Sequence, residues 1–322
     1  MKGSIAHPIL FLKRLLKPAV RAALPLFPQG IIEKGVKLRH SLIDYLPPDK
    51  HMIFRKYLGD ICIDVDTLYP IEREMLTGCY EWETIKIIDR FVHAGDVCFD
   101  VGANVGPLSF ALAKRVVPDG RVYACEPGNF LFRRLVNNVR LNPAYEKVIL
   151  PCAVGFSDKK EIRYWNEDKK NRGNAGFLFQ QPNQQQRIEL TTLDDFVGEQ
   201  SIRHLNFIKI DVEGMEYEVI KGGIGTIEKH KPVLYYETGL YENKFWAESL
   251  RGEKVVLAIE RLLEDLGYRF YKFESGDFRE TRYPNLNYNT LAVHGGIRSE
   301  VQFFPKNKRG HDSGPTSACC CR

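Results

Sequence analysis

The sequence has 322 residues, of which 44% are hydrophobic and 27% are charged, a composition typical of a globular protein. The formal net charge of +5 is unevenly spread, because residues 1–40 hold eight lysines and arginines against the single acid Glu33. Residues 41–294 are mildly acidic as a result. This charge distribution argues against a domain that binds duplex DNA or RNA, and we expect no nucleic-acid partner.

Residues 1–50 have the composition of a basic extension. The apolar run at residues 8–12 is followed at once by Lys13 and Arg14, so it is too short for a membrane span and too interrupted for a secretory signal. We therefore expect a cytoplasmic protein. Residues 9–24 mix apolar and basic side chains, which predicts either a helix docked on its own domain or a peripheral contact with an anionic membrane.

From residue 96 onward, short apolar or β-branched runs alternate with longer helical patterns, as in a parallel sheet with helices on both faces. The predicted strands are Val97 to Val101, Arg121 to Cys125, Lys147 to Cys152, Asn206 to Ile210 and Val233 to Tyr236. The predicted helices are Leu108 to Val116, Phe130 to Leu141, Met215 to Lys221 and Lys254 to Leu266. Between them, residues 166–186 are rich in Asn, Gln and Gly and predict a mobile loop.

Two later runs complete the predicted sheet. Tyr268 to Phe273 and Thr290 to His294 flank a polar segment, so we expect an antiparallel pair at one sheet edge. The sequence thus predicts an α/β protein with a doubly wound, Rossmann-like, seven-stranded and mostly parallel sheet over residues 96–294. Residues 51–95 would add a helical and β extension that serves as a substrate or cap segment, and residues 295–322 are predicted to be a disordered tail.

The first predicted strand opens into a turn that contains glycine. Asp100 ends this strand and is followed by Gly102, Asn104 and Gly106. Ligands of doubly wound sheets bind outside the carboxyl ends of the strands, where this turn brings backbone amides close to them. The spacing departs from the GxGxxG pattern of dinucleotide sites, which argues against a nicotinamide oxidoreductase. Asp100 could instead accept hydrogen bonds from a cationic amino-acid ligand, such as the methionine moiety of S-adenosylmethionine.

The next strand ends in a second acid. Glu126, followed by Pro127, comes about twenty residues after the glycine turn, where an acidic side chain can accept both ribose hydroxyls of a nucleoside. The glycine turn, Glu126 and the regular alternation of predicted strands and helices together predict a nucleoside-binding site. The alternative for Glu126 is a helix-capping or surface acid.

The fourth strand carries the candidates for acceptor chemistry. An oxygen nucleophile loses its proton as it is methylated, so a carboxylate or a tuned lysine within hydrogen-bond reach can act as the base. Lys209, Asp211 and Glu213 are these candidates. Strand alternation places Lys209 and Asp211 on one face, so an internal ion pair is the competing interpretation.

Glu237 ends the fifth strand and could face the same cleft as Asp211. Two carboxylates placed in this way could hold a divalent cation that positions and acidifies an acceptor hydroxyl. Nothing in the spacing requires a metal, so a divalent cation is possible here but not needed.

Five segments resemble the FkbM family of methyltransferases in order and spacing over roughly Glu72 to Val293. They are FDVGANVG at 99–106, CEP at 125–127, TTLDDF at 191–196, IKIDVEGMEYEVIKGG at 208–223 and PVLYYE at 232–237. The resemblance also includes residues 78–83, which precede the first strand.

The resemblance implies S-adenosylmethionine as donor and a hydroxyl acceptor on a sugar, glycolipid or secondary metabolite. It implies an acceptor role for the segment Asp211 to Gly214. It also implies cofactor roles for five residues, Asp100, Gly102, Asn104, Gly106 and Glu126. The rival hypothesis is a catalytically silent domain of the same fold that serves as an interaction module at a membrane surface.

Overall fold

The computed structural model describes residues 50–78, 80–166, 185–237, 252–274, 277–281 and 289–296. The basic extension with its segment 9–24, most of the loop at 166–186 and nearly all of the predicted tail lie outside the described residues. Within the described part, no helix is long and apolar enough to cross a membrane.

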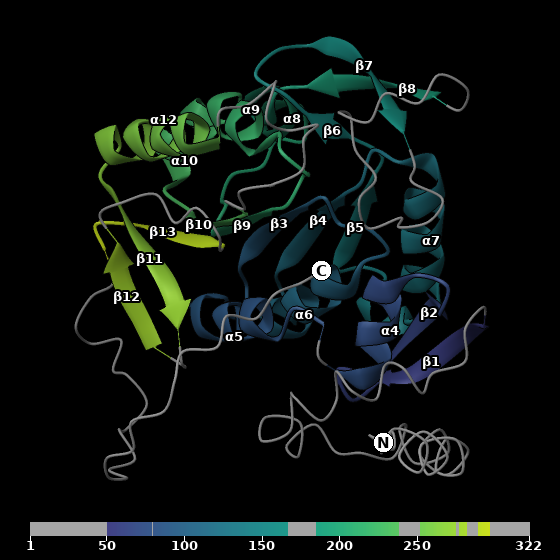
Figure 1. Ribbon diagram of the computed structural model, residues 1–322. Helices are drawn as coiled ribbons and strands as arrows, with labels where there is room; N and C mark the ends of the chain where they lie inside the picture. Colours follow the sequence, from purple (N-terminus) through teal and green to yellow (C-terminus); the bar gives the residue numbers. More distant parts are fainter. Residues whose placement is uncertain are drawn as a thin grey trace, which may run out of the picture.

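An eight-stranded sheet forms the centre of the molecule, in the order β12-β11-β13-β10-β9-β3-β4-β5 (Figure 1). Its parallel part consists of β3 (Val97–Val101), β4 (Arg121–Cys125), β5 (Ile149–Cys152), β9 (Phe207–Ile210) and β10 (Val233–Tyr236). Antiparallel pairing begins at β13 (Thr290–His294), which lies between β10 and β11 (Tyr268–Glu274). The predicted doubly wound, mostly parallel α/β sheet is confirmed.

The sheet has one strand more than the seven predicted. The two late runs do pair with each other, but the edge strand is β12 (Asp277–Thr281), which pairs with β11. Its sequence, DFRET, has no apolar run because an edge strand can leave charged side chains in solvent. The structure therefore corrects the count of strands to eight.

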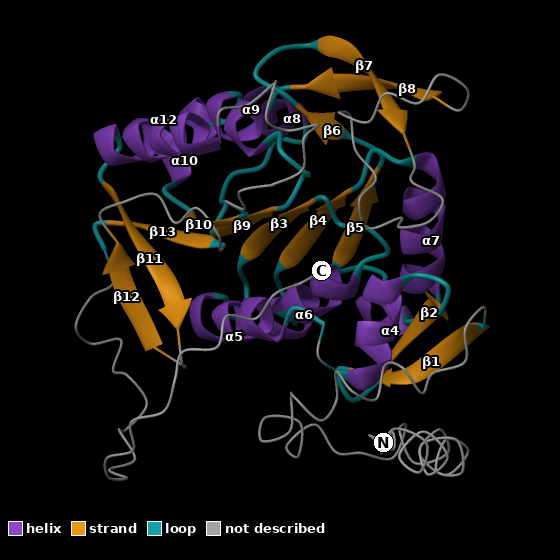
Figure 2. Ribbon diagram, in the orientation of Figure 1, coloured by secondary structure: helices purple, strands orange, loops and turns teal. Residues whose placement is uncertain are grey.

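Helices cover both faces of the sheet, each above its own hydrophobic core (Figure 2). One face carries α5 (Trp82–Phe91), α6 (Pro107–Val116) and α7 (Asn129–Arg140), which is followed by a short 3-10 helix, Pro143–Tyr145. The other carries α8 (Leu193–Glu199), α9 (Glu216–Lys221), α10 (Ile224–His230) and α12 (Gly252–Asp265). Successive side chains of a strand point to opposite faces of the sheet, so they pack into different cores. Phe207 of β9 lies in one core and Ile208 lies in the other.

The residues before the sheet pack against it rather than forming a separate body. They comprise β1 (His51–Tyr57), β2 (Ile61–Asp66) and α4 (Pro70–Thr77). The side chain of Asn138 on α7 accepts from the Asp64 amide at 2.8 Å, and that of Asn142, one turn later, accepts from the Cys62 amide at 2.8 Å. The edge of β2 is thus hydrogen-bonded by the helix, which fixes this segment beside the glycine turn.

A buried ion pair strengthens this attachment. Nη2 of Arg134 on α7 donates to Oε2 of Glu72 on α4 at 2.8 Å and to the Asp64 carbonyl at 2.9 Å. The glutamate also accepts from the Asp66 amide at 2.6 Å. The hydrogen bonds meet the condition under which buried charges are tolerated.

A small second sheet lies beyond the carboxyl end of β5, in the order β6-β8-β7. Its strands are β6 (Gly155–Phe156), β7 (Glu161–Asn166) and β8 (Gln185–Thr191). The ends of β7 and β8 fall within the polar segment that was predicted to be a loop.

Candidate active site

The turn after β3 has a backbone that favours glycine. Gly102, Asn104 and Gly106 have φ values of +79°, +52° and +95°. A Cβ atom on Gly102 would lie 1.8 Å from the carbonyl oxygen of Asp211, so no other residue fits there. Asn104 tolerates its conformation because its side-chain oxygen accepts from the next amide at 2.8 Å.

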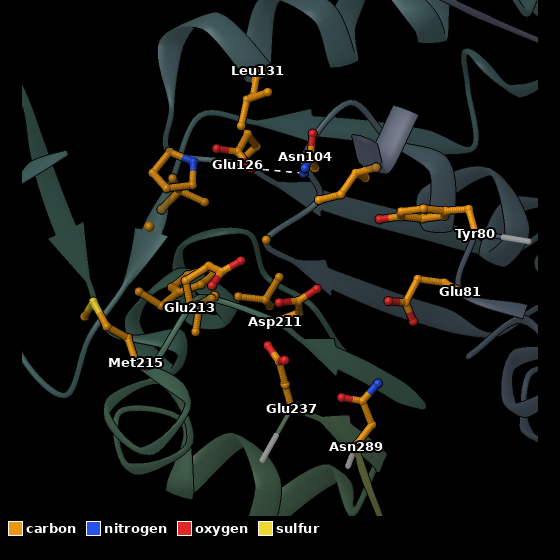
Figure 3. Close-up of a pocket in the computed structure, with 18 of the residues that line it drawn as sticks. Tyr80, Glu81, Asn104, Glu126, Leu131, Asp211, Glu213, Met215, Glu237 and Asn289 are labelled. Carbon is orange, nitrogen blue, oxygen red and sulfur yellow. Dashed lines mark hydrogen bonds between the residues drawn. The ribbon is translucent and has the colours of Figure 1, made fainter. Parts of the chain in front are cut away.

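Glu126 lies at the carboxyl end of β4, beside this turn (Figure 3). It is 3% exposed, and its two oxygens accept from the amides of Asn104 at 3.0 Å and Gly128 at 2.8 Å. Burial raises the pKa of Glu126 to about 7, although both amides act to lower it. Each carboxylate oxygen of Glu126 can still accept one more hydrogen bond, so the two oxygens together can bind two vicinal hydroxyls.

Lys209 of β9 joins the glycine turn after β3 to Asp211, the first residue of the turn after β9. Its buried Nζ lies 3.0 Å from the Gly102 carbonyl, 3.3 Å from Asp100 Oδ1 and 3.4 Å from Asp211 Oδ2. The predicted ion pair with Asp211 is therefore present. The two carboxylates raise the pKa of Lys209, despite the opposing effect of its burial. An ammonium held in this way favours a structural role for Lys209.

Asp100 is turned away from the ligand side of the sheet. It is fully buried, and its Oδ2 accepts from the Ser109 hydroxyl at 2.6 Å. With Lys209 on its other oxygen, Asp100 anchors the glycine turn to α6. It does not line the cavity where a methionine moiety would lie.

The turn after β9 also uses positive φ, at Glu213 (+53°) and Gly214 (+98°). Glu216 at the start of α9 holds it, because its Oε1 accepts from the amides of Val212 at 3.1 Å and Gly214 at 3.3 Å. Burial raises the pKa of Glu216 to about 7, as it does for Glu126. Sequence reasoning missed Glu216, although an acid two residues after Gly214 was a visible signal.

A cavity of roughly 210 Å³ lies between the two turns. Its lining includes apolar groups beside Glu126, namely Pro127, Leu131, Val154 and Phe156. It also includes the carboxylates Glu74, Glu81, Glu126, Asp211, Glu213 and Glu237, and among the described lining residues there is no lysine, arginine or histidine. The cavity therefore favours a ligand with positive charge.

Glu81 and Tyr80 close the cavity on the side of the N-terminal segment (Figure 3). Glu81 is the residue before α5, and the hydroxyl of Thr84 donates to its Oε2. The sequence analysis noted the segment at 78–83 as part of the resemblance but assigned it no chemistry. That segment was the available signal.

The structure brings most of the predicted site residues to this cavity. Those that line it are Gly102, Asn104, Glu126, Pro127, Asp211, Glu213 and Glu237, whereas Asp100, Gly106 and Lys209 do not. Among the described residues, no group of three His, Cys, Asp or Glu side chains has the arrangement of a metal site. The possible cation between Asp211 and Glu237 stays a prediction.

The model of the methyltransferase FkbM domain matches residues 100–270, which include both turns and the whole of β4, β5, β9 and β10, while β3 begins three residues earlier. This match covers more than half of the chain. The chain belongs to the FkbM methyltransferase family. The predicted class is thereby confirmed, and with it S-adenosylmethionine as the methyl donor.

Two curated methyltransferases are similar to the chain. Methyltransferase 1 of Beauveria bassiana is 26% identical over 189 residues, which are 47% of this chain and 75% of that protein. The hexuronic acid methyltransferase AglP of Haloferax volcanii is 27% identical over 143 residues, 44% of this chain and 56% of that protein.

Among solved structures, the methyltransferase FkbM of Methylobacillus flagellatus KT is 15% identical, with a TM-score of 0.43. The similarity covers 82% of this chain and 60% of that one.

The residues of the cavity fit S-adenosylmethionine. Glu126 has lone pairs for the ribose hydroxyls, and the apolar side chains beside it suit an adenine ring. The absence of a side chain at Gly102 lets a ligand approach the backbone. The donor is positively charged at its sulfonium, which matches a lining rich in carboxylates.

Proposed function

We propose that this protein is an O-methyltransferase that transfers the methyl group of S-adenosylmethionine to a hydroxyl of a sugar, glycolipid or secondary metabolite. The observation that carries the proposal is the asymmetry of the cavity. Its nucleoside end is built around Glu126 and apolar side chains, while the end beside β9 and β10 is lined by carboxylates. The hexuronic acid specificity in the name of one relative supports a sugar acceptor.

The donor would lie along the edge formed by the carboxyl ends of β4, β3 and β9. Glu126 and Pro127 would hold the ribose, and the backbone of Gly102 and Asn104 would support the methionine part. When bound, the donor supplies a methyl group made electrophilic by its sulfonium. That group would face the turn after β9, because the glycine turn and Asp211 are in direct backbone contact.

Asp211 and Glu213 would form the acceptor side. Asp211 is partly exposed and is paired with Lys209, so it can accept a hydrogen bond from an acceptor hydroxyl and orient it. Glu213 lies on a backbone whose positive φ is costly for a residue other than glycine, and such strain concentrates at functional sites. Lys209 would position both turns, and positioning accounts for a large part of catalysis in bimolecular transfer.

Residues 51–95 would act as the cap. Ile71, Glu74, Tyr80 and Glu81 all line the cavity, and the hydrogen bonds from α7 keep their segment in place. The cap would exclude water from the reacting methyl group and contact the acceptor.

Methyl transfer to a hydroxyl is tested with S-adenosylmethionine carrying a tritiated methyl group and a panel of alkyl hexosides, hexuronates and amino sugars. We expect label in a methyl ether, which survives mild base. Label that appears only on amines or carboxylates would contradict O-methylation. Saturable binding of S-adenosylhomocysteine without transfer to any hydroxyl would instead favour the interaction module.

A further inference from the structure

One carboxylate of the acceptor end comes from outside the sheet. Glu81 reaches the cavity from the segment before α5, and its side chain lies across from Asp211 (Figure 3). We propose that Glu81 is the general base that removes the proton of the acceptor hydroxyl. This inference rests on the function proposed above and names a residue that carries it out.

The position of Glu81 is fixed by its surroundings. Its φ is +45°, a value that costs free energy for any residue with a Cβ and persists only where the structure enforces it. The Thr84 hydroxyl donates to Oε2, which orients the carboxyl and leaves acceptor capacity on Oε1. Glu81 is therefore held at the cavity wall in a set orientation, as a base must be.

Two other carboxylates of the cavity, Asp211 and Glu126, are engaged differently. Asp211 is paired with the Lys209 ammonium, whose Nζ lies 3.4 Å from Asp211 Oδ2. Glu126 uses both oxygens on backbone amides at the nucleoside end. Among the residues that the structure describes, no cation lies within hydrogen-bond distance of Glu81, and its only side-chain partner is the neutral Thr84 hydroxyl.

The local electrostatics make Glu81 a stronger base than an ordinary glutamate. Burial raises its pKa, and the charge of Asp211 raises it further, while the Thr84 hydroxyl and the more distant Lys209 act in the opposite direction. The titratable groups whose charges interact with it are Tyr57, Tyr80, Glu83, Lys209, Asp211 and Tyr235. A carboxylate with a raised pKa is closer to the pH at which it would operate.

The step balances without any further reactant. The acceptor oxygen forms a bond to the methyl carbon as the bond from that carbon to sulfur breaks, and its electron pair stays on sulfur. The hydroxyl proton moves to an Oε atom of Glu81. The products are the methyl ether, S-adenosylhomocysteine and the protonated carboxyl group, which then releases its proton to solvent.

This placement can be tested without knowing the acceptor. A base that faces the transferring methyl group also faces the positive charge of the donor. Sinefungin carries a protonated amine in that place, whereas S-adenosylhomocysteine carries a neutral thioether there. The ratio of the two affinities, measured by calorimetry across a pH series, therefore reports the charge beside the methyl position. The contribution of Glu126 cancels because both ligands have the same ribose.

We expect the preference for sinefungin to grow about tenfold as Glu81 ionises, and to stay flat with pH in Glu81→Gln. Glu83→Gln is the matched control, since it removes the same charge two residues further along the chain, at a side chain that does not line the cavity. In Glu83→Gln the preference for sinefungin should still rise as the pH rises, and we call this rise the pH step. Urea unfolding of each variant checks that it is folded.

Two results would overturn the assignment, and they are distinguishable. If the pH step survives in Glu81→Gln while both ligands bind normally, Glu81 is not beside the methyl group, although the proposed function stands. If neither ligand binds the folded wild-type protein, the proposed function fails, and the role of Glu81 fails with it.

Discussion

The two turns that flank the cavity follow one plan. Each turn comes directly after a central parallel strand and contains residues with positive φ. Each is held by a buried glutamate that accepts hydrogen bonds from backbone amides. Glu126 binds the amide of Asn104 after β3, and Glu216 binds those of Val212 and Gly214 after β9. The pKa of both glutamates is raised to about 7 by burial.

The difference between them lies in what each glutamate faces. Glu126 comes from the neighbouring strand and opens onto the cavity, whereas Glu216 comes from the helix behind its own turn and does not line the cavity. Burial, hydrogen bonding and a perturbed pKa therefore do not by themselves mark a ligand-binding residue. The direction in which the side chain points decides which glutamate serves the ligand and which serves the fold.

The largest effect should come from adding a methyl group where the turns touch. Gly102→Ala places a Cβ within 1.8 Å of the Asp211 carbonyl, so we expect a loss of about 4 kcal/mol or more in urea unfolding and no cofactor binding. Gly95→Ala is the matched control, because Gly95 has a similar φ of +87° but no atom within 4 Å of its Cβ. Equal losses in the two variants would show that φ, rather than the contact between the turns, is the constraint.

The next effect should come from removing the ammonium that joins the turns. Lys209→Met leaves Asp100 buried without a cation, and breaking such a buried pair costs roughly 3 to 5 kcal/mol in urea unfolding. Adding Asp100→Asn to this variant should restore part of the loss. Lys221→Met, which removes an exposed pair with Asp158, should change stability far less. A small effect at Lys209 would mean that the turns hold their positions without it.

A smaller effect should appear in the pH dependence of stability. Glu126 and Glu216 have folded-state pKa values of about 7 against 4.5 for an ordinary glutamate, so protonation favours the folded state. Their contribution is complete below about pH 4.5 and is lost as the pH rises through 7.

Unfolding by urea at a series of pH values measures this contribution. Each of Glu126→Gln and Glu216→Gln should remove roughly 2 to 4 kcal/mol of the decline between pH 4.5 and 7. The two variants should behave alike in this measurement, because it reports burial and not direction. A decline that neither variant reduces would place the responsible groups elsewhere.

The smallest effect should come from relieving strain in the turn after β9. Glu213→Gly removes the cost of a positive φ, so stability in urea should stay the same or rise by up to about 1 kcal/mol. If Glu213 serves the acceptor, methyl transfer should fall at the same time while binding of S-adenosylhomocysteine is unchanged. A loss of stability would show that the side chain holds the turn.

The sequence predicted the parallel sheet closely, because strands buried on both faces have continuous apolar runs that end in acids. All its predicted strands and helices from Val97 to Leu266 are found within two residues of their bounds. It missed β12, since a charged edge strand has no such run.

The site was predicted less completely. Glu126, Asp211 and Glu237 line one cavity, because parallel strands end at one edge of the sheet. Glu81 and Glu216 were missed, since one arrives from a segment outside the sheet and the other is revealed only by the amides it binds. The sequence did not predict the orientation of the Asp100 side chain either. The alternation of side chains along a strand does not show whether an acid at its end faces a ligand or a buried lysine.

Calorimetric titration with S-adenosylhomocysteine of Glu126→Gln and Glu216→Gln, compared with the wild-type protein near pH 8, tests the account most directly. Only the glutamate that faces the cavity should matter for the ligand, so we predict that Glu126→Gln weakens binding by about tenfold or more and Glu216→Gln leaves it within about twofold. Wild-type binding should also tighten as the pH rises through 7, because the ionised carboxylate accepts the ribose hydroxyls, and Glu126→Gln should abolish this dependence. Equal weakening in both variants, or none in either, would contradict the assignment of Glu126 as the anchor of the methyl donor.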